Sequence, residues 1–512
     1  MSKKPTFRIL FVLVTILVIA SMAESNVIGA STSKTLSTNF TLVNLSTTAD
    51  AQVQVTYLKD DGSIWDADDA NETFVIPKNY GIMQIRQYFD NIMSSGKGSA
   101  VISSSEDLRA IVQIQARGQV PTQGAYSGFT TGSTKFYVPL VIKNRNTASG
   151  FANTQIVVQN LEGTNQVSGT IDLINEDGSL RYSKPFSNLP AGVSLYYDIA
   201  DEAESNVPSG WYGSAVVNSI GGNVAVVSNF FTGPDAMQSF NAFPQESLSK
   251  TWVVPLFFSR LANGLSTVVT VQNLSDSAIP QDGITLTCTK NPNFPGPDTL
   301  LVQLPVSLGK SASYSFNPVT DHEMFPDSGW GGSCQIDAGL ADIVAIVQMR
   351  YVNAPTGFSG AAAYEAIPMS VTDNTEIIPL IAKRLPNGFA TVAVIQNFDF
   401  VNPATVDLLY TPSKVAMECP INICDINDDG VVDDLDKIMI NDVVVPAGGS
   451  IQRNHRISGG PESEPSLPDG WQGSLVVISD KPVSGFAQLT NISVLTGDTF
   501  MAHNALTTVT AP

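Results

Sequence analysis

Most of the chain consists of short runs in which apolar residues alternate with small polar ones. A side-chain period of two is typical of β-strands, and no stretch keeps a helical period over three or more turns, so the pattern predicts an all-β protein. Three runs open with an apolar tetrapeptide that contains proline, followed by a turn with glycine and a second alternating run that ends in Gln-Asn. The openings are Tyr137-Val-Pro-Leu140, Val253-Val-Pro-Leu256 and Ile377-Ile-Pro-Leu380, and the Gln-Asn pairs are at 159–160, 272–273 and 396–397.

A second landmark, Gly-Trp-x-Gly-Ser, recurs later in each of these segments. It is found at residues 210–214, 329–333 and 470–474, and a divergent form, Gly-Lys-Gly-Ser, is at 96–99. Two apolar alternating runs joined by a short turn follow each copy, which predicts a hairpin. A flat indole ring can stack on a sugar, but recurrence at one place in three copies favours a structural tryptophan that covers the end of a core.

The repeat length indicates the domain organisation. The equivalent residues Asn44, Asn160, Asn273 and Asn397 lie 113 to 124 residues apart, about the size of an antiparallel sandwich of seven to nine strands. We therefore expect four tandem β-sandwich domains after a signal peptide at 1–23. Their expected bounds are 24–132 for the divergent repeat 1, 133–247 for repeat 2, 248–369 for repeat 3 and 370–512 for repeat 4.

The first residues have the features of a secretory signal. Lys3, Lys4 and Arg8 precede an apolar run of about twelve residues, and Ser21-Met-Ala23 offers small residues for cleavage. Because the run is shorter than the roughly 20 residues that span a bilayer, cleavage is favoured over an uncleaved anchor. No second such run follows, so we expect the mature protein to be secreted or at the cell surface, without a transmembrane segment.

Charge and cysteine usage agree with export. The formal net charge is −20, and no basic cluster is interleaved with aromatic residues, so nucleic acid and anionic lipid are not expected partners. Four cysteines, an even number, favour disulfides in an oxidising compartment. We expect Cys419 to pair with Cys424, and Cys288 with Cys334, two unrelated buried thiols being the alternative for the second pair.

Residues 425–436, Asp-Ile-Asn-Asp-Asp-Gly-Val-Val-Asp-Asp-Leu-Asp, form the one local motif with a definite chemistry. A twelve-residue calcium loop takes its ligands from positions 1, 3, 5, 7, 9 and 12 and turns sharply at a glycine in position 6. Gly430 stands at position 6 in this register. The predicted ligands of Ca²⁺ are Asp425, Asn427, Asp429, the carbonyl of Val431, Asp433 and Asp436, and Mg²⁺ is a competitor. A solvated acidic turn is the alternative, although it leaves this register unexplained.

The repeat alignment indicates where the loop lies. Repeats 1 and 2 have tight acidic turns, Asp60-Asp-Gly62 and Glu176-Asp-Gly178, after the strand that follows the Asn landmark. Repeat 4 is about twenty residues longer between its landmarks, and the extra residues, about 415–442, contain the loop. We expect an insertion at a hairpin tip that projects into solvent, with a short apolar helical face at Lys437-Ile-Met-Ile440 after it.

At these residues the chain resembles two known groups of proteins. The loop at 425–436 is similar to an EF-hand loop with Asp in place of the usual Glu at position 12, and it looks most like a dockerin repeat. Dockerins pair two such loops to bind a cohesin, and one loop is found here, so the resemblance implies the metal role alone. The four repeats resemble Ig-like sandwich repeats of exported bacterial surface proteins, which implies a fold but no activity.

The chain contains no recognisable catalytic motif. His322, His455 and His503 stand outside any known pattern, and no nucleophile elbow, zinc-binding helix or phosphate loop is present. We expect a non-enzymatic structural or adhesive protein that binds Ca²⁺, with a cell-surface or matrix protein or a glycan as its partner. A calcium-dependent docking or glycan-binding module is the alternative. A secreted hydrolase, the third possibility, would need clustered carboxylates in a cleft.

Overall fold

The computed structural model is built almost entirely of antiparallel strands, as the alternating sequence predicts. Between strands of the described residues lie the short helix α2 (Ile421–Cys424) and the 3-10 turns η1 (Gln87–Phe89), η2 (Ile199–Asp201), η3 (Gln245–Ser247) and η4 (Asp434–Asp436). The structure describes residues 12–16, 36–65, 72–89, 93–116, 122–147, 150–233, 236–325, 327–353, 359–370, 373–494 and 497–507. The expected signal peptide lies outside them except for Val12–Ile16, which forms strand β1. None of the helices in these ranges is long and apolar enough to cross a membrane.

Each sequence repeat contributes two antiparallel sheets. The sheet with the Asn landmark at the end of a strand is here named the Asn-strand sheet, and the sheet with the Gly-Ser landmark is named the Trp-strand sheet. In repeat 1 the Asn-strand sheet has the order β5 (Ile82–Arg86), β2 (Leu36–Asn44), β7 (Leu108–Ala116), β8 (Thr122–Ser127), and the Trp-strand sheet has the order β1, β6 (Gly98–Ser104), β3 (Ala51–Lys59), β4 (Thr73–Ile76). In repeat 2 the Asn-strand sheet has the order β10 (Arg145–Thr147), β11 (Gly150–Asn160), β16 (Val224–Thr232), β17 (Ala236–Asn241), with β14 (Ser194–Asp198) beside β11, and the Trp-strand sheet has the order β13 (Leu180–Leu189), β12 (Val167–Asn175), β15 (Tyr212–Ile220), β9 (Lys135–Ile142), β18 (Phe243–Pro244).

Repeats 3 and 4 follow the same plan. In repeat 3 the Asn-strand sheet has the order β23 (Ser313–Phe316), β20 (Leu265–Asn273), β25 (Ile343–Tyr351), β26 (Ala361–Glu365), and the Trp-strand sheet has the order β22 (Thr299–Gln303), β21 (Thr285–Lys290), β24 (Trp330–Asp337), β19 (Thr251–Ser259), β27 (Ile367–Pro368). In repeat 4 the Asn-strand sheet has the order β32 (Ser450–Asn454), β29 (Phe389–Asn397), β34 (Val483–Asn491), β35 (Phe500–Asn504), and the Trp-strand sheet has the order β31 (Ile438–Val445), β30 (Ala404–Pro412), β33 (Gln472–Ser479), β28 (Thr375–Ala382), β36 (Leu506–Thr507).

Both sequence landmarks have structural roles. The buried side chain of Asn273 donates from Nδ2 to the carbonyls of Ser277 (2.9 Å) and Leu308 (3.0 Å), and Asn44, Asn160 and Asn397 make equivalent bonds. The landmark tryptophans Trp211, Trp330 and Trp471 are buried as well. Their rings therefore pack inside the repeats, as the sequence favoured, and are not available to stack on a sugar.

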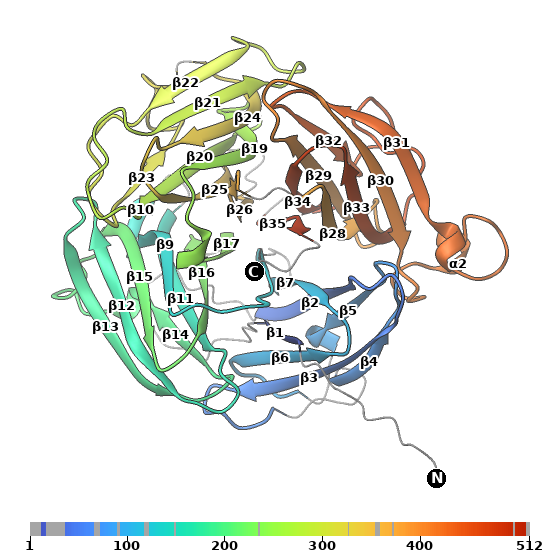
Figure 1. The fold of residues 1–512 in the computed structure, drawn as a ribbon, viewed down its shortest axis with the longest axis horizontal. Helices are drawn as coiled ribbons and strands as arrows, with labels where there is room; N and C mark the ends of the chain where they lie inside the picture. Colours follow the sequence, from blue (N-terminus) through green and yellow to red (C-terminus); the bar gives the residue numbers. More distant parts are fainter. Residues whose placement is uncertain are drawn as a thin grey trace.

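The four repeats form a closed ring around a common centre (Figure 1). The innermost strands β8, β17, β26 and β35 contact one another there, and the Trp-strand sheet of each repeat packs on the Asn-strand sheet of the next. One contact recurs at all four junctions: the landmark serine donates from Oγ to a backbone carbonyl of the following repeat. The bonds are Ser99 to Gly192 (2.5 Å), Ser214 to Ser311 (2.5 Å), Ser333 to Gly448 (3.0 Å) and, from the last repeat back to the first, Ser474 to Tyr80 (2.8 Å).

A single buried carboxylate ties the repeats together at the centre. Asp498 of repeat 4 accepts the backbone N–H of Met237 in repeat 2 (2.8 Å) and of Ala361 in repeat 3 (3.0 Å). The backbone N–H of Gln123 in repeat 1 also bonds to it. Burial raises the pKa of Asp498 well above its usual value, and these N–H donors act against the shift. The side chain therefore joins all four repeats.

Candidate functional site

The predicted calcium loop lies where the repeat alignment indicates. Strands β30 and β31 form a hairpin, and residues between Pro412 and Ile438 make up its long connection. Figure 1 shows this connection, with α2, at the outer edge of repeat 4 beside repeat 1. The predicted apolar helical face at Lys437–Ile440 is wrong, because residues from Ile438 onward enter strand β31 and pair with β30. β-branched side chains and a free strand edge outweigh the local helical spacing there.

The loop turns back on itself around its own backbone amides. Asp425 accepts the N–H of Asp429 (3.1 Å) and of Gly430 (2.8 Å), and Asn427 Oδ1 accepts the same N–H of Asp429 (3.0 Å). The φ of Gly430 is +90°, the left-handed conformation that glycine adopts without strain. The first three expected ligands thus lie around one sharp turn.

The last expected ligand closes the loop. Asp436 is fully buried, and its Oδ1 accepts the N–H of Ile426 (2.6 Å) and of Asn427 (3.2 Å). Its Oδ2 accepts the N–H of Asp433 (2.8 Å), whose own carboxylate caps η4 through Leu435. Hydrogen bonds therefore hold the side chain at position 12 to the backbone at positions 2, 3 and 9.

The residues present suit a hard cation in their chemistry, since every predicted ligand offers oxygen. Among the described residues, no three Asp, Glu, His or Cys side chains gather as a metal-ligand cluster. The loop carboxylates are instead directed to backbone N–H groups. A carboxylate has about four lone-pair sites, and Asp425 uses two of them in the bonds above. Capacity for a cation remains, but the side chains must turn toward it.

The insertion also connects repeat 4 to repeat 1, which corrects the expectation that it projects freely into solvent. Asp434 Oδ2 accepts from Asn79 Nδ2 (2.6 Å), and its Oδ1 accepts from Lys414 Nζ (3.0 Å). Glu418, which is buried, accepts the backbone N–H of Gln84 (2.8 Å). We name these two cross-repeat bonds, Asp434–Asn79 and Glu418–Gln84, the clasp. Local sequence gave no sign of it, because its partners are more than 300 residues apart.

The charges of the clasp are balanced by its surroundings. Partial burial raises the pKa of Asp434, but the bonds from Lys414 and Asn79 outweigh it and hold that pKa below its usual value. Burial raises the pKa of Glu418, and the bonds from Ser413 and the Gln84 N–H oppose the shift. The clasp therefore combines an ionised carboxylate at its edge with a buried acid inside.

Both predicted cysteine pairs are disulfides in the structure. Cys288 and Cys334 lie opposite each other on β21 and β24. Cys419 and Cys424 are joined across α2, directly before Asp425, and both are buried. The second disulfide anchors the start of the loop in the core of repeat 4.

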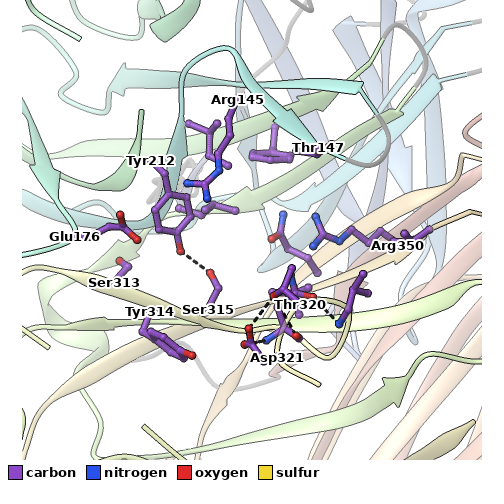
Figure 2. A pocket seen from close by; sticks show the side chains of 18 of the residues that line it. Arg145, Thr147, Glu176, Tyr212, Ser313, Tyr314, Ser315, Thr320, Asp321 and Arg350 are labelled. Atoms are coloured by element: carbon purple, nitrogen blue, oxygen red, sulfur yellow. Dashed lines mark hydrogen bonds between the residues drawn. The ribbon is translucent and has the colours of Figure 1, made fainter. Parts of the chain in front are cut away.

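A second candidate site lies at the junction of repeats 2 and 3, and the sequence did not indicate it. A cavity of about 530 Å³ opens between the Trp-strand sheet of repeat 2 and the Asn-strand sheet of repeat 3; we name it the junction pocket (Figure 2). Tyr212 Oη bonds to Ser315 Oγ (2.6 Å), which also bonds to Thr270 Oγ1 (2.8 Å). The guanidinium of Arg145 lies over the Tyr212 ring at 4.9 Å.

Two arginines face one tyrosine in the junction pocket. Burial and the charge of Glu176 raise the pKa of Tyr212 to about 12, while Ser315, Arg145 and Arg350 act against this rise. Arg350 extends from β25 toward the cavity (Figure 2). Its Nε is buried without a hydrogen-bond partner, and no ion pair reaches it within the described ranges. Burial lowers the pKa of Arg350, although a guanidinium stays protonated at physiological pH.

The repeat alignment held one signal for this pocket. Position x of Gly-Trp-x-Gly-Ser is Tyr212 in repeat 2 and Gln472 in repeat 4, and both residues line junction cavities. That position is Gly331 in repeat 3, so it varies among the three full copies of the landmark while its neighbours do not. Arg145 and Arg350 carried no such signal, because the partners that define their surroundings come from another repeat.

Comparisons with known proteins identify no family for this chain. No family model matches it, and no curated protein does. Similar solved structures include a tetra-tandem repeat from the extending region of a large adhesion protein, at 13% identity, covering 98% of this chain and 100% of that one, with a TM-score of 0.11. The partial N-terminal region of an enterococcal surface protein is 8% identical, with 78% and 89% covered and a TM-score of 0.18. The serine-rich repeat adhesion glycoprotein of Streptococcus agalactiae is 11% identical, with 78% and 88% covered and a TM-score of 0.10. At these TM-scores the likeness carries no argument about this chain, whose function is argued below from its own residues.

Proposed function

We propose that this chain is a non-enzymatic, exported surface or matrix protein of four β-sandwich domains, in which Ca²⁺ fastens the last domain to the first. Asp425, Asn427, Asp429, the Val431 carbonyl, Asp433 and Asp436 would hold the ion. The observation that carries the proposal is the bond between Asp434, inside this ligand register, and Asn79 of repeat 1. Ordering the loop would order the clasp with it.

The ion's proposed role is to offset the repulsion between the aspartates of the loop. Six aspartates lie between 425 and 436, and their mutual repulsion opposes a compact loop unless a cation is present. A divalent ion at the centre of the loop would remove that repulsion and supply coordination bonds in exchange for some of the backbone N–H bonds. Because the ion binds the folded loop, it stabilises the folded protein by linkage, by about 2.7 kcal/mol when free calcium is about 100 times Kd.

Export is supported by the cysteines and the charge. Two disulfides form without leaving a free cysteine among the described residues, and disulfides persist in oxidising compartments. The net charge of −20 favours solubility and disfavours nucleic acid. A closed ring offers a rigid body for display at a surface.

Calorimetric titration of the protein with CaCl2, after chelator treatment, tests the metal site. We expect one binding event, lost in Asp425→Ala because position 1 loses its carboxylate. Asp428→Asn is the matched control: it removes one charge at position 4, which is not a ligand, and asparagine tolerates the left-handed φ of +60° there. Equal titration curves for Asp425→Ala and the unsubstituted protein would show that the loop holds no calcium.

One observation favours the docking alternative. Ile426, Val431 and Leu435 are 42%, 56% and 72% exposed on the loop surface. Exposed apolar side chains on one loop can serve as a contact surface for a partner. Capture of a surface or matrix component that is lost both on chelation and in Leu435→Ser would favour docking over a purely structural loop. Capture that persists under both conditions would argue against it.

A further inference from the structure

The junction pocket contains an arginine, Arg350, whose buried Nε has no hydrogen-bond partner. Transfer of a guanidinium from water is costly unless an anion or several acceptors replace the water. The side chain of Arg350 makes no hydrogen bond or ion pair with another described residue; its Nε is buried and unbonded, and the residue as a whole is half-buried. By contrast, Arg86 in the equivalent cavity between repeats 4 and 1 donates to Gln84 Oε1 from Nε (3.2 Å) and Nη2 (2.7 Å). Arg456 in the cavity between repeats 3 and 4 donates to Asn454 (3.1 Å).

Two arginines, Arg145 and Arg350, line the junction pocket together with Tyr212. The guanidinium of Arg145 lies over the Tyr212 ring at 4.9 Å, and Arg350 lines the same cavity from β25. Figure 2 shows Tyr212 and Arg350 on opposite sides of the cavity, with the Tyr212 hydroxyl bonded to Ser315. Guanidinium groups bind carboxylates through paired, charge-assisted hydrogen bonds. A carboxylate seated there would meet Arg350 on one side and Tyr212 on another.

The rest of the lining selects among anions. Glu176 and Asp321 carry negative charge at the same cavity, which disfavours a multiply charged anion such as phosphate. Carboxylates are good acceptors for hydroxyl groups, and the lining adds Thr147, Asn317 and Thr320 as further polar partners. A ligand that suits both parts has one carboxylate and several hydroxyls. The cavity, at about 530 Å³, is within the range of small-molecule sites.

We propose that the junction pocket binds an acidic monosaccharide, free or at the end of a glycan, through its carboxylate at Arg350 and Arg145 and its hydroxyls at Asp321 and Glu176. This rests on the proposed role as an exported surface or matrix protein and gives that role a ligand class. It is independent of the calcium loop, which lies at another junction of the ring.

Ligand-observed NMR and calorimetry with free sugars test the proposal. The probes are methyl β-glucuronide and N-acetylneuraminic acid, with methyl β-glucoside as the neutral counterpart and inorganic phosphate as the alternative anion. We expect at least one acidic sugar to bind, with the neutral sugar and phosphate weaker by roughly tenfold or more. Equal affinity for glucoside and glucuronide, tighter binding of phosphate, or no binding of either acidic sugar would overturn the proposal.

Substitutions locate the site. Arg350→Gln should weaken binding of the acidic sugar by roughly tenfold or more, and Arg145→Gln should weaken it less. Arg86→Gln, in the equivalent cavity, is the matched control and should leave binding unchanged. Because the Arg350 Nε makes no bond, Arg350→Gln should keep or raise Tm without ligand, whereas a structural role predicts a lower Tm. Binding that Arg350→Gln does not alter would also overturn the proposal.

The same samples separate this inference from the proposed function. If calcium still binds and no acidic sugar does, the pocket assignment fails and the calcium loop stands. If acidic sugar binds and calcium does not, the loop assignment fails and the pocket stands. Attachment to cells or matrix that persists in Arg350→Gln would show that adhesion uses another surface and would remove the pocket from that function.

Discussion

At the scale of single residues, the centre of the ring is defined by side chains that bond to the backbone of a neighbouring repeat. Asn241 donates from Nδ2 to the Ser127 carbonyl (2.9 Å), and Asn504 donates to the Glu365 carbonyl (2.7 Å). Each amide oxygen also accepts a backbone N–H from the same partner: Asn241 from Ser127, and Asn504 from Glu365. Glu365 stands at the equivalent position of repeat 3 and accepts the N–H of Asn241 (2.5 Å). As a carboxylate it has no proton to donate in return.

Glu365 should make stability depend on pH. Burial raises the pKa of Glu365 to about 7, against the bond from the Asn241 N–H, from an ordinary value of 4.5. Its stabilising contribution is therefore complete below pH 4.5 and is lost as pH rises to about 7, on the order of 3 kcal/mol of unfolding free energy. Glu365→Gln keeps the acceptor and adds a donor, so we expect a higher Tm at pH 8 and a smaller change in Tm between pH 5 and pH 8. Parallel Tm–pH curves for the two proteins would contradict this.

The residues that sequence identified and those it missed differ in the range of their interactions. The ligand register of the calcium loop is complete within twelve residues, so its spacing is visible in the chain. Glu365, Arg350 and Asp498 owe their properties to groups in other repeats. Such surroundings are fixed only by the packing of the ring.

At the scale of elements, the sequence predicted the strands but not the burial of their polar faces. Alternation of Val with Thr or Gln in β20 predicts one face in the core and one in solvent. All nine residues of β20 are buried, because its polar face packs on the neighbouring repeat. Gln272 on that face donates to the Ser311 carbonyl (3.0 Å). Its Nε2 also donates across the junction to the Ala215 carbonyl of repeat 2 (3.4 Å), so an uncharged polar side chain can be buried there with backbone partners.

The landmark serines should contribute to the junctions. Ser474→Ala would leave the Tyr80 carbonyl without its donor across the junction of repeats 4 and 1. We expect a loss of about 1 kcal/mol in unfolding free energy, measured by chemical denaturation. Ser205→Ala, at an exposed position, is the control and should change stability by less than about 0.5 kcal/mol. A Ser474→Ala protein as stable as the control would mean that this bond does not hold the junction.

At the scale of the whole molecule, the repeats act as parts of one ring. The repeat length predicts four similar units. Closure of the ring also requires the Trp-strand sheet of repeat 4 to contact the Asn-strand sheet of repeat 1, and no local sequence pattern encodes that contact. Asp498 secures the centre and the clasp secures the outer edge of the final junction. Among the described residues, only this junction carries an insertion with an acidic loop, so an ion bound there could control closure of the ring.

Hydrogen exchange with calcium and with chelator tests the central claim, that calcium in the loop at 425–436 closes the ring. If the claim holds, calcium slows amide exchange in the loop and also in repeat 1 at residues 79–86, through the clasp bonds at Asn79 and Gln84. In Asp425→Ala neither segment responds, and the junction of repeats 2 and 3 is unaffected in both proteins. Slower exchange in the loop alone would reduce calcium to a local role, and unchanged exchange in both segments would contradict the claim.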